Sequence, residues 1–203
     1  MNKNTLKNEL ERYSKKLFFA DRVETKAPRS MHKYHFHNSY ELYYLYSGER
    51  YYFIKDKMYH VTPGDLVFIN EYDIHCTTNV PNCGYDRVII DFKKEFLEDF
   101  LNCVENINLF ECFKKEPHIV HLDGEQRILV ETLFKSIIKE QNQKNAGYDT
   151  YLKSSLLQIL YLINRDISQS QEPVTPHFIE KHNSISEIAG YINNHFDEDI
   201  TLD

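Results

Sequence analysis

The segment HFHNSYELYYLYSG, residues 35–48, carries both the main signal for the fold and the candidate chemistry of this chain. Its second half is a dense aromatic and apolar run closed by Ser-Gly, which is typical of a buried β-strand followed by a turn. Its first half places two histidines one residue apart and a glutamate four residues after the second. The segment is therefore a metal site, a binding pocket for an organic molecule, or only the inner face of a β-sheet.

Short runs of the same texture continue from residue 31 to residue 92. They include RYYFI, LVFI and DRVIIDF, and turn-forming clusters such as TPGD and VPNCG separate them. About seven strands at this close spacing leave no room for crossover helices. The pattern predicts an antiparallel barrel or sandwich.

After Phe92 the apolar period lengthens from that of a strand to that of a helix. Helices are predicted over residues 123–142, where Asp123 is the N-cap and Gln126 the capping-box partner, and over residues 148–167. Each helix carries one apolar stripe, which packs either on the β-domain and the other helix or across the two-fold seam of a homodimer. The stripe residues are Val130, Leu133, Phe134, Ile137 and Ile138 in the first helix, and Leu152, Leu156, Ile159, Leu160, Ile163 and Ile167 in the second.

These changes of pattern divide the chain into five predicted segments. They are an N-terminal arm with one amphipathic helix, a β-barrel, a helical region, a linker and the first helix of a further domain, at residues 1–30, 31–92, 93–167, 168–183 and 184–203. The linker is expected because SQSQEPVTP is polar, has no periodicity and contains two prolines. Ser184 and Glu187 form a capping box that begins a new helix, which is too short to bury a core of its own.

The net charge of −7 is concentrated near the end of the chain, where residues 171–203 contain seven acidic residues against one base, Lys181. Because nucleic-acid affinity comes largely from Lys and Arg neutralising phosphates, this segment and the rest of the chain are expected to bind DNA poorly by themselves. The four cysteines form no closely spaced metal or redox pair. No apolar run approaches the roughly 18 residues of a membrane span, so a cytoplasmic protein without membrane contact is expected.

Strand geometry brings the candidate ligands together only with a bend. His35 and His37 share one face of a strand, about 7 Å apart at Cα. Glu41 has the same parity but would lie roughly 20 Å from His35 in a straight strand, so a shared site requires the turn that the intervening Asn-Ser pair can form. With His75 from a later strand, three imidazoles and one carboxylate suit iron, nickel, zinc or manganese.

Two other interpretations of these residues stay open. Histidines inside a narrow barrel also hydrogen-bond one another and a carboxylate without any ligand. Alternatively, they line a pocket for an organic effector together with strand aromatics, for which Tyr44 and Tyr51 are the candidates, beside Tyr43 and Phe53. No nucleophile with an adjacent base, no Gly-rich phosphate loop and no pair of catalytic carboxylates is evident.

The spacing H-x-H-x3-E-x6-G from residue 35 to residue 48 resembles the first motif of the cupin superfamily, and H-x3-N from residue 75 to residue 79 resembles the end of its second motif. The glycine and the Pro-x-Gly that the family has upstream are replaced here by Arg29 and by Asn-Glu-Tyr at residues 70–72. In metal-binding cupins the matching positions ligate the ion. The resemblance thus implies one set of ligands: His35, His37, Glu41 and His75.

The phrase YHVTPGDLVFINEYDIH, residues 59–75, is similar to the sensor domains of AraC-type bacterial transcription regulators, and ISEIAGYINNHFDEDITLD, residues 185–203, resembles the first helix of their DNA-binding domain and the approach to its second helix. The resemblance implies an α+β fold, in which a small antiparallel cupin (jelly-roll-like) β-barrel is followed by an α-helical dimerisation region. The chain is expected to stop before the helix-turn-helix units.

The function implied is that of a sensor rather than an enzyme. A small-molecule effector would contact the barrel, a homodimer would form through helices 123–142 and 148–167, and DNA would be reached only through the C-terminal domain. The effector-binding candidates are His35, His37, Glu41, Tyr44, Tyr51 and His75. No cofactor is required in this interpretation, with a divalent Zn, Ni, Fe or Mn ion as an option. The alternative class is a small metal-dependent cupin enzyme, an oxygenase or isomerase, whose ion activates a substrate.

Overall fold

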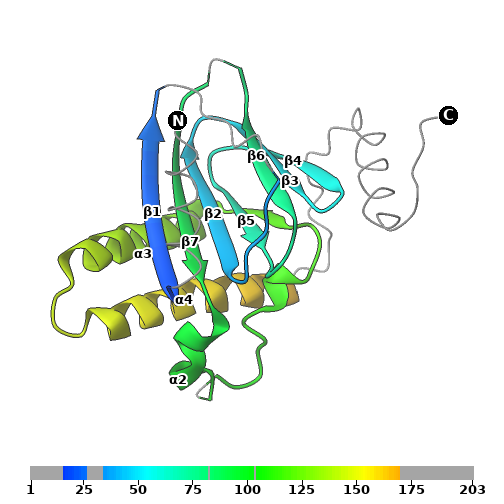
Figure 1. Ribbon diagram of the computed structural model, residues 1–203. Coiled ribbons are helices and arrows are strands. Elements are labelled where there is room, and N and C mark those ends of the chain that lie inside the picture. The colour runs from blue at the N-terminus through cyan, green and yellow to red at the C-terminus, as the bar shows by residue number, and fades with distance from the viewer. Residues whose placement is uncertain (1–15, 27–33, 82, 103, 170–203) are drawn as a thin grey trace.

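The computed structural model describes residues 16–26, 34–81, 83–102 and 104–169 (Figure 1). The amphipathic helix predicted in the N-terminal arm falls largely within residues 1–15, outside this range. The capping box near residue 184 and almost all of the predicted linker also lie outside the described residues.

Two antiparallel sheets stack as a sandwich, with two long helices along the outer face of the larger sheet (Figure 1). The larger sheet has the strand order β1-β7-β2-β5-β8 and the smaller one β4-β3-β6. This architecture confirms the predicted α+β fold of cupin type. The strands are β1 (Phe18–Thr25), β2 (Tyr40–Ser47), β3 (Arg50–Ile54), β4 (Lys57–Val61), β5 (Asp65–Ile69), β6 (His75–Asn79), β7 (Tyr85–Phe92) and β8 (Ile119–His121).

The helices lie close to their predicted positions. The long ones are α3 (Gly124–Gln143) and α4 (Tyr148–Gln169), and the short ones are η1 (Lys94–Leu97), α2 (Glu98–Leu101) and η2 (Glu111–Phe113). The predicted side-chain cap of α3 is wrong, because Asp123 makes no capping hydrogen bond with its side chain. Gly124 has a φ of +46°, so helical dihedral angles begin one residue later than the capping-box pattern requires.

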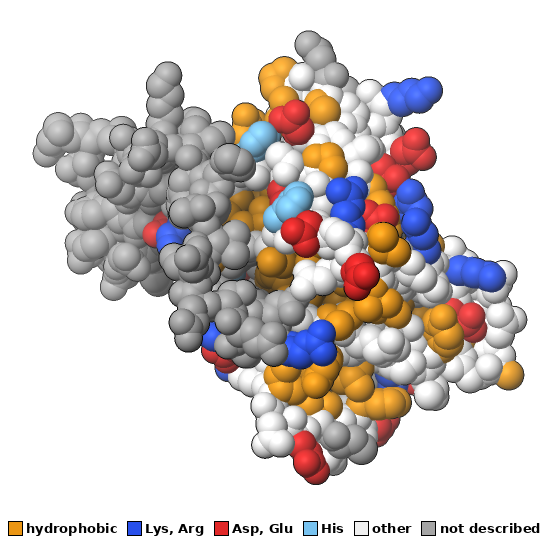
Figure 2. All heavy atoms as spheres, turned by 180° about the vertical axis from the view of Figure 1, so that it is seen from behind, with side chains coloured by type: hydrophobic (Ala, Val, Ile, Leu, Met, Phe, Trp, Pro, Cys, Tyr) orange, Lys and Arg blue, Asp and Glu red, His pale blue; other side chains and the backbone are white. Residues whose placement is uncertain are grey.

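Basic and acidic side chains are interspersed on the face of the molecule seen in Figure 2, and no continuous basic surface forms among the coloured residues. Within the described part of the chain, no helix is both long and apolar enough to cross a membrane.

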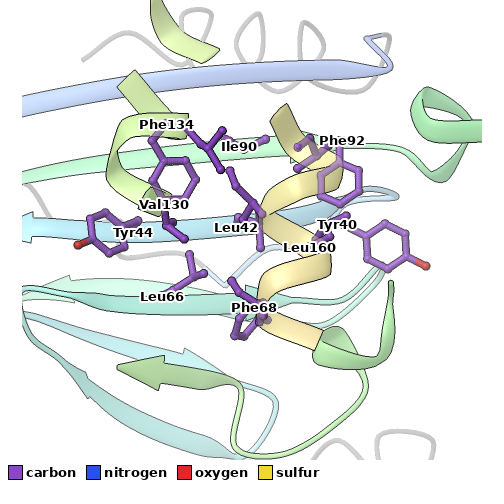
Figure 3. Packing of buried hydrophobic residues seen from close by; sticks show 14 of the residues in the cluster. Tyr40, Leu42, Tyr44, Leu66, Phe68, Ile90, Phe92, Val130, Phe134 and Leu160 are labelled. Atoms are coloured by element: carbon purple, nitrogen blue, oxygen red, sulfur yellow. The ribbon is translucent and has the colours of Figure 1, made fainter. Parts of the chain in front are cut away.

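Strand β2 separates two hydrophobic cores. Its even-numbered Leu42 and Tyr44 face the long helices and belong to the larger core, where Phe134 of α3 and Leu160 of α4 pack (Figure 3). Its odd-numbered side chains, such as Tyr43, belong to the second core, between the two sheets. Apart from Ile167, whose side chain lies outside the described part of the structure, the apolar stripes of α3 and α4 therefore pack on the larger sheet and on each other, as the first of the two predicted arrangements requires.

The sheet extends beyond the predicted barrel of residues 31–92. Residues 18–25, predicted as part of an arm, form strand β1 and pair with β7 along its whole length. The pattern was missed because charged residues interrupt it. Two of them are paired in the structure, with Arg22 Nη2 2.6 Å from Asp86 Oδ2 and Asp21 Oδ2 3.5 Å from Arg87 Nη1. Strand β8, in the region predicted as helical, adds three residues to the other edge next to β5.

Candidate metal and effector site

His35 and His37 precede β2 in a segment that is mostly irregular. His35 forms an isolated antiparallel bridge with His75, each main-chain N–H donating to the other carbonyl at 3.0 Å. The bend predicted at Asn38 and Ser39 is present, and β2 begins directly after it. The chain thus turns between the histidine pair and the glutamate, as a shared site requires.

The three histidine rings form a compact group. Ring centroids are 4.2 Å apart for His35 and His75, 5.0 Å for His37 and His75, and 6.0 Å for His35 and His37. One nitrogen from each ring lies within 4.8 Å of the others. The structure therefore brings together the three histidines that were predicted from the sequence to share one site.

Glu41, the second residue of β2, lies beside two of these histidines. Its Oε2 lies 3.2 Å from Nε2 of His37 and 3.7 Å from Nε2 of His75, while its Oε1 accepts a hydrogen bond of 2.7 Å from the hydroxyl of Tyr52. Glu41 also forms a second group of possible ligands with His37 and Asp91, whose ligand atoms all lie within 4.8 Å of one another. His37 is common to both groups.

Main-chain carbonyls fix the orientation of two imidazoles. Nδ1 of His37 donates to the carbonyl of Ser39 at 2.9 Å, and Nδ1 of His75 donates to the carbonyl of Asp73 at 2.8 Å. In both rings Nε2 then faces Oε2 of Glu41. In the metal-free protein Nε2 of His37 donates a hydrogen bond to this oxygen at 3.2 Å, whereas Nε2 of His75 lies 3.7 Å from it. Nε2 of His75 is buried and has no hydrogen-bond partner among the described residues. Histidines that bind metals usually donate their second ring N–H in this way.

The spacing of these atoms fits a metal ion. Metal–ligand bonds of about 2.1 Å place neighbouring ligand atoms of a six-coordinate ion about 3.0 Å apart and opposite ones about 4.2 Å apart. The distances of 3.2 Å and 3.7 Å from Glu41 Oε2 to the two Nε2 atoms lie inside this range. The donors of the two groups of possible ligands, imidazoles and carboxylates, suit the same divalent ions that the sequence indicated.

Burial and neighbouring charges shift the pKa values of the ionisable groups of the site in opposite directions. Burial alone would lower the pKa of His37, but its hydrogen bond to Glu41 and the charges of Glu41 and Asp91 outweigh it and raise the pKa to about 9. Burial lowers the pKa of His75 to about 4. Although Glu41 is buried, His37, His75 and Tyr52 hold its pKa well below the usual range. Burial and the charge of Glu41 raise the pKa of Asp91 to about 7.

Two of the predicted effector residues do not reach this site. Tyr44 lies on the opposite face of β2, where its ring packs on Phe134 at 5.3 Å and its hydroxyl donates to Glu131 of α3 at 2.7 Å. Tyr51 is half-buried with its ring 5.2 Å from that of His60. Strand alternation explains both outcomes, because Tyr44 is three residues from Glu41, and Tyr51 is adjacent to the inward-facing Tyr52.

The sequence interpretation missed two residues of the site, Asp91 and Tyr52. Asp91 pairs directly with Glu41 in the β2–β7 register, and Tyr52 lies on β3 of the other sheet. The available signal for Asp91 was a single carboxylate in the otherwise apolar end of DRVIIDF. Nothing in the local pattern of RYYFI distinguishes Tyr52 from its neighbour, because only the position of β3 opposite β2 brings it to Glu41.

An antiparallel sandwich with a His–Glu centre between its sheets and a helical pair on its outer face defines a ligand-binding domain of cupin type. Residues 21–160 match the family model described as AraC-like ligand binding domain, and the chain belongs to this family. It is therefore a sensing domain of the kind found in AraC-type transcription regulators.

Individual relatives agree with this assignment. The chain is 21% identical over 181 residues to YbfI of Bacillus subtilis (strain 168), described as an uncharacterized HTH-type transcriptional regulator, and the match covers 79% of this chain but 62% of that relative. The chain thus spans less than two thirds of the length of the curated relative. The structure is similar to the crystal structure of an apo ToxT variant from Vibrio cholerae, with a TM-score of 0.52, 10% identity, and coverage of 93% of this chain and 69% of ToxT. At this identity the likeness shows the shared fold alone.

Proposed function

We propose that this chain is the effector-sensing and dimerisation part of a cytoplasmic AraC-type transcription regulator, and that its sensing centre holds a divalent metal ion through His35, His37, Glu41 and His75. The proposal of a metal ion rests on the orientation of the imidazoles. Main-chain carbonyls take the Nδ1 protons of His37 and His75, so both Nε2 atoms converge on Oε2 of Glu41. A purely structural histidine would not favour a buried Nε2 without a hydrogen bond, as His75 has among the described residues.

The surroundings of the centre provide both polar and apolar contacts for an effector. When bound, the ion supplies Lewis acidity and coordination positions for an oxygen or nitrogen atom. Tyr52 holds the second oxygen of Glu41, and Tyr43 lies beside it with a ring centroid distance of 5.0 Å. In this proposal these two tyrosines take the place of Tyr44 and Tyr51 as the aromatic residues of the effector site.

Strand β2 links the centre to the helices. Glu41 faces the centre, and the next side chain, Leu42, lies in the core formed with α3 and α4. Further along β2, the hydroxyl of Tyr44 donates to Glu131 of α3. Because packed interiors transmit displacements rather than absorb them, a shift of β2 on effector binding would change the position of the helical pair.

The proposed homodimer uses the outer faces of the two long helices. Their apolar stripes are occupied within the protomer, but large apolar side chains remain exposed on both helices. They are Ile128 and Leu129 of α3, and Tyr148, Tyr151 and Tyr161 of α4. DNA contact is assigned to the C-terminal domain implied by the relatives, since the described surface is not continuously basic on the face in Figure 2.

The metal-dependent enzyme considered from the sequence is less supported. The family match indicates ligand binding, and the curated relative is described as a transcriptional regulator. The two long helices of the chain pack in the larger hydrophobic core. Sensing without catalysis is therefore the function that we assign to the centre.

Element analysis of the whole chain, purified without chelators, tests the metal. Two variants form a matched pair: His75→Ala removes a ligand, and His60→Ala removes a histidine that pairs with Glu49 at 2.9 Å outside the centre. About one equivalent of a divalent ion is expected in the unmodified protein and in His60→Ala, and little in His75→Ala. A folded protein that takes up none of zinc, nickel, iron or manganese at micromolar concentration would contradict the proposed metal binding. Direct contact of the same residues with the effector would then be the remaining function of the centre.

A further inference from the structure

Two buried hydrogen-bond donors on the inner face of the larger sheet lie outside the proposed metal centre. They are the hydroxyl of Tyr43 on β2 and Nη1 of Arg87 on β7, and neither makes a hydrogen bond with the described residues. We propose that these two donors bind a carboxylate of the effector, which is therefore an organic acid. The inference rests on the proposed sensing function and adds to it the chemical class of the effector.

The register of the larger sheet places the two donors on one face. Arg87 is the cross-strand partner of Leu45, and Tyr43 precedes Leu45 by two residues, so all three side chains point between the sheets. In agreement with this direction, Tyr43 and Leu45 belong to the second core. Glu41 lies two residues before Tyr43 on the same face, roughly 7 Å away at Cα. The donors therefore lie beside the metal centre and not within it.

The hydroxyl of Tyr43 is fully buried. Tyr43 is 1% exposed, and its ring packs on the ring of Tyr52 with a centroid distance of 5.0 Å. Unlike the hydroxyl of Tyr52, which donates to Glu41, the hydroxyl of Tyr43 has no acceptor in the described part of the chain. A buried hydroxyl without a partner is unfavourable, and an oxygen atom of a ligand would satisfy it.

The ion pair of Arg87 leaves room for a stronger acceptor. Nη1 of Arg87 lies 3.5 Å from Oδ2 of Asp21, and the side chain of Asp21 is 37% exposed, so water screens this pair. The charge of Arg87 also lowers the pKa of Asp91, but burial and Glu41 have larger effects and raise this pKa to about 7. A carboxylate at normal hydrogen-bond distance from Nη1 would bind Arg87 more strongly than Asp21 does.

A second guanidinium, that of Arg50 on β3, adds positive charge from the smaller sheet. Arg50 is 4% exposed, donates to the side chains of two β6 residues, and places its Cζ 4.3 Å from the ring centroid of Tyr85. Burial raises the pKa of Tyr43, and the charges of Arg50 and Arg87 are the largest influences that oppose this rise. Both guanidinium groups therefore favour a negative charge next to the hydroxyl of Tyr43.

The surroundings of these donors indicate the rest of the effector. The second core around them is apolar, with aliphatic side chains from both sheets, such as Val61 of β4 and Val67 of β5. A carboxylate on a compact apolar or aromatic body suits such surroundings. A molecule with many hydroxyl groups would need hydrogen-bond partners on every side, which aliphatic side chains do not provide.

Calorimetric titrations of the whole chain with benzoate and benzamide test this assignment. The two probes have nearly the same shape, and only benzoate is charged, so benzoate should bind at least about 10-fold more tightly. Arg87→Gln is expected to weaken benzoate binding by at least about 10-fold and Tyr43→Phe by at least about 3-fold. Arg22→Gln is the matched control, because Arg22 lies on the neighbouring strand β1 and pairs with Asp86 at 2.6 Å, and it should leave benzoate binding unchanged.

Acetate and acetamide form a smaller pair of probes that needs less space. Equal affinities for acid and amide in both pairs, or no binding of either acid at millimolar concentration, would overturn the proposed carboxylate site. Benzoate binding that Arg87→Gln and Tyr43→Phe leave unchanged would also overturn it. The thermal midpoint of each variant monitors folding, and Tyr43→Phe gives the test by itself if Arg87→Gln does not fold.

Element analysis of the same samples separates this proposal from the metal centre. Neither Arg87 nor Tyr43 is a proposed metal ligand, so both variants should keep the metal content of the unmodified protein. A protein that holds its metal but does not prefer benzoate would overturn the carboxylate site alone. A metal-free protein that still prefers benzoate would support the carboxylate site and contradict the metal centre.

Discussion

Replacing Tyr52 by phenylalanine removes one hydroxyl from the centre and keeps the ring. This hydroxyl donates a hydrogen bond of 2.7 Å to Oε1 of Glu41, and the exposed fractions of the two residues are 1% and 4%. A hydrogen bond to a charged group contributes about 1.5–3 kcal/mol, and its loss also leaves a buried carboxylate oxygen without this donor. We therefore expect Tyr52→Phe to lower the free energy of unfolding by about 2–3 kcal/mol.

Tyr43 offers a matched control with the opposite expectation. Its ring lies 5.0 Å from that of Tyr52 and it is equally buried, at 1% exposure. Its hydroxyl has no hydrogen-bond partner among the described residues. Tyr43→Phe removes a buried group that is not satisfied, so the free energy of unfolding should be unchanged or higher by up to about 1 kcal/mol.

Urea unfolding of chelator-treated protein at pH 7, followed by far-ultraviolet circular dichroism, measures both changes. The chain has no tryptophan, so circular dichroism is the better probe. Equal slopes of the free energy against urea would show that the unfolded states are alike. If the two variants lose the same free energy, the hydroxyl of Tyr52 does not hold Glu41 and the proposed orientation of that carboxylate is wrong. A second readout is Mn²⁺ affinity, which Tyr52→Phe should lower by about 10- to 100-fold.

Three further predictions concern stability. Gln141→Ala removes two hydrogen bonds of 2.7 Å that join α3 to the main chain of Ala20 in β1, and should cost about 1–2 kcal/mol in urea unfolding. Asn164→Ala leaves buried main-chain groups near η2 unsatisfied, and should cost about 2–4 kcal/mol by the same measurement. Although His37 is buried, the neighbouring carboxylates raise its pKa to about 9. In the metal-free protein, the contribution of charged His37 to the free energy of unfolding is therefore complete below about pH 6.5 and is lost as the pH rises to about 9. His37→Gln should reduce this dependence of the free energy of unfolding on pH, measured by urea unfolding.

Local sequence patterns were sufficient for the elements with an uninterrupted apolar period. The helices predicted over residues 123–142 and 148–167 correspond to α3 and α4 within two residues at each end. Strand β1 was not predicted because its stability comes from β7, with which it pairs along eight residues, and from charge pairs that depend on that pairing. A strand of this kind has no local signal strong enough to outweigh its charged composition.

The same distinction separates the site residues that were predicted from those that were not. His35, His37 and Glu41 lie within seven residues, so strand parity and one bend could place them relative to each other. Tyr52 and Asp91 reach Glu41 only through cross-strand register and the stacking of two sheets, which no local pattern specifies. The parity rule, applied consistently, would also have excluded Tyr44 from the centre, since it is an odd number of residues from Glu41.

The residues of the centre come from both sheets, so an ion bound there would also stabilise the fold. Glu41 and Asp91 lie on the larger sheet, whereas His75 and Tyr52 lie on the smaller one. The donors therefore converge only when the sandwich is closed, and an ion that binds them binds the folded state. At an ion concentration 100 times the dissociation constant, such binding stabilises the fold by about 2.7 kcal/mol. Because His75→Ala removes the donor from the smaller sheet, this variant should lose the metal-dependent increment in stability even where its metal-free fold is intact.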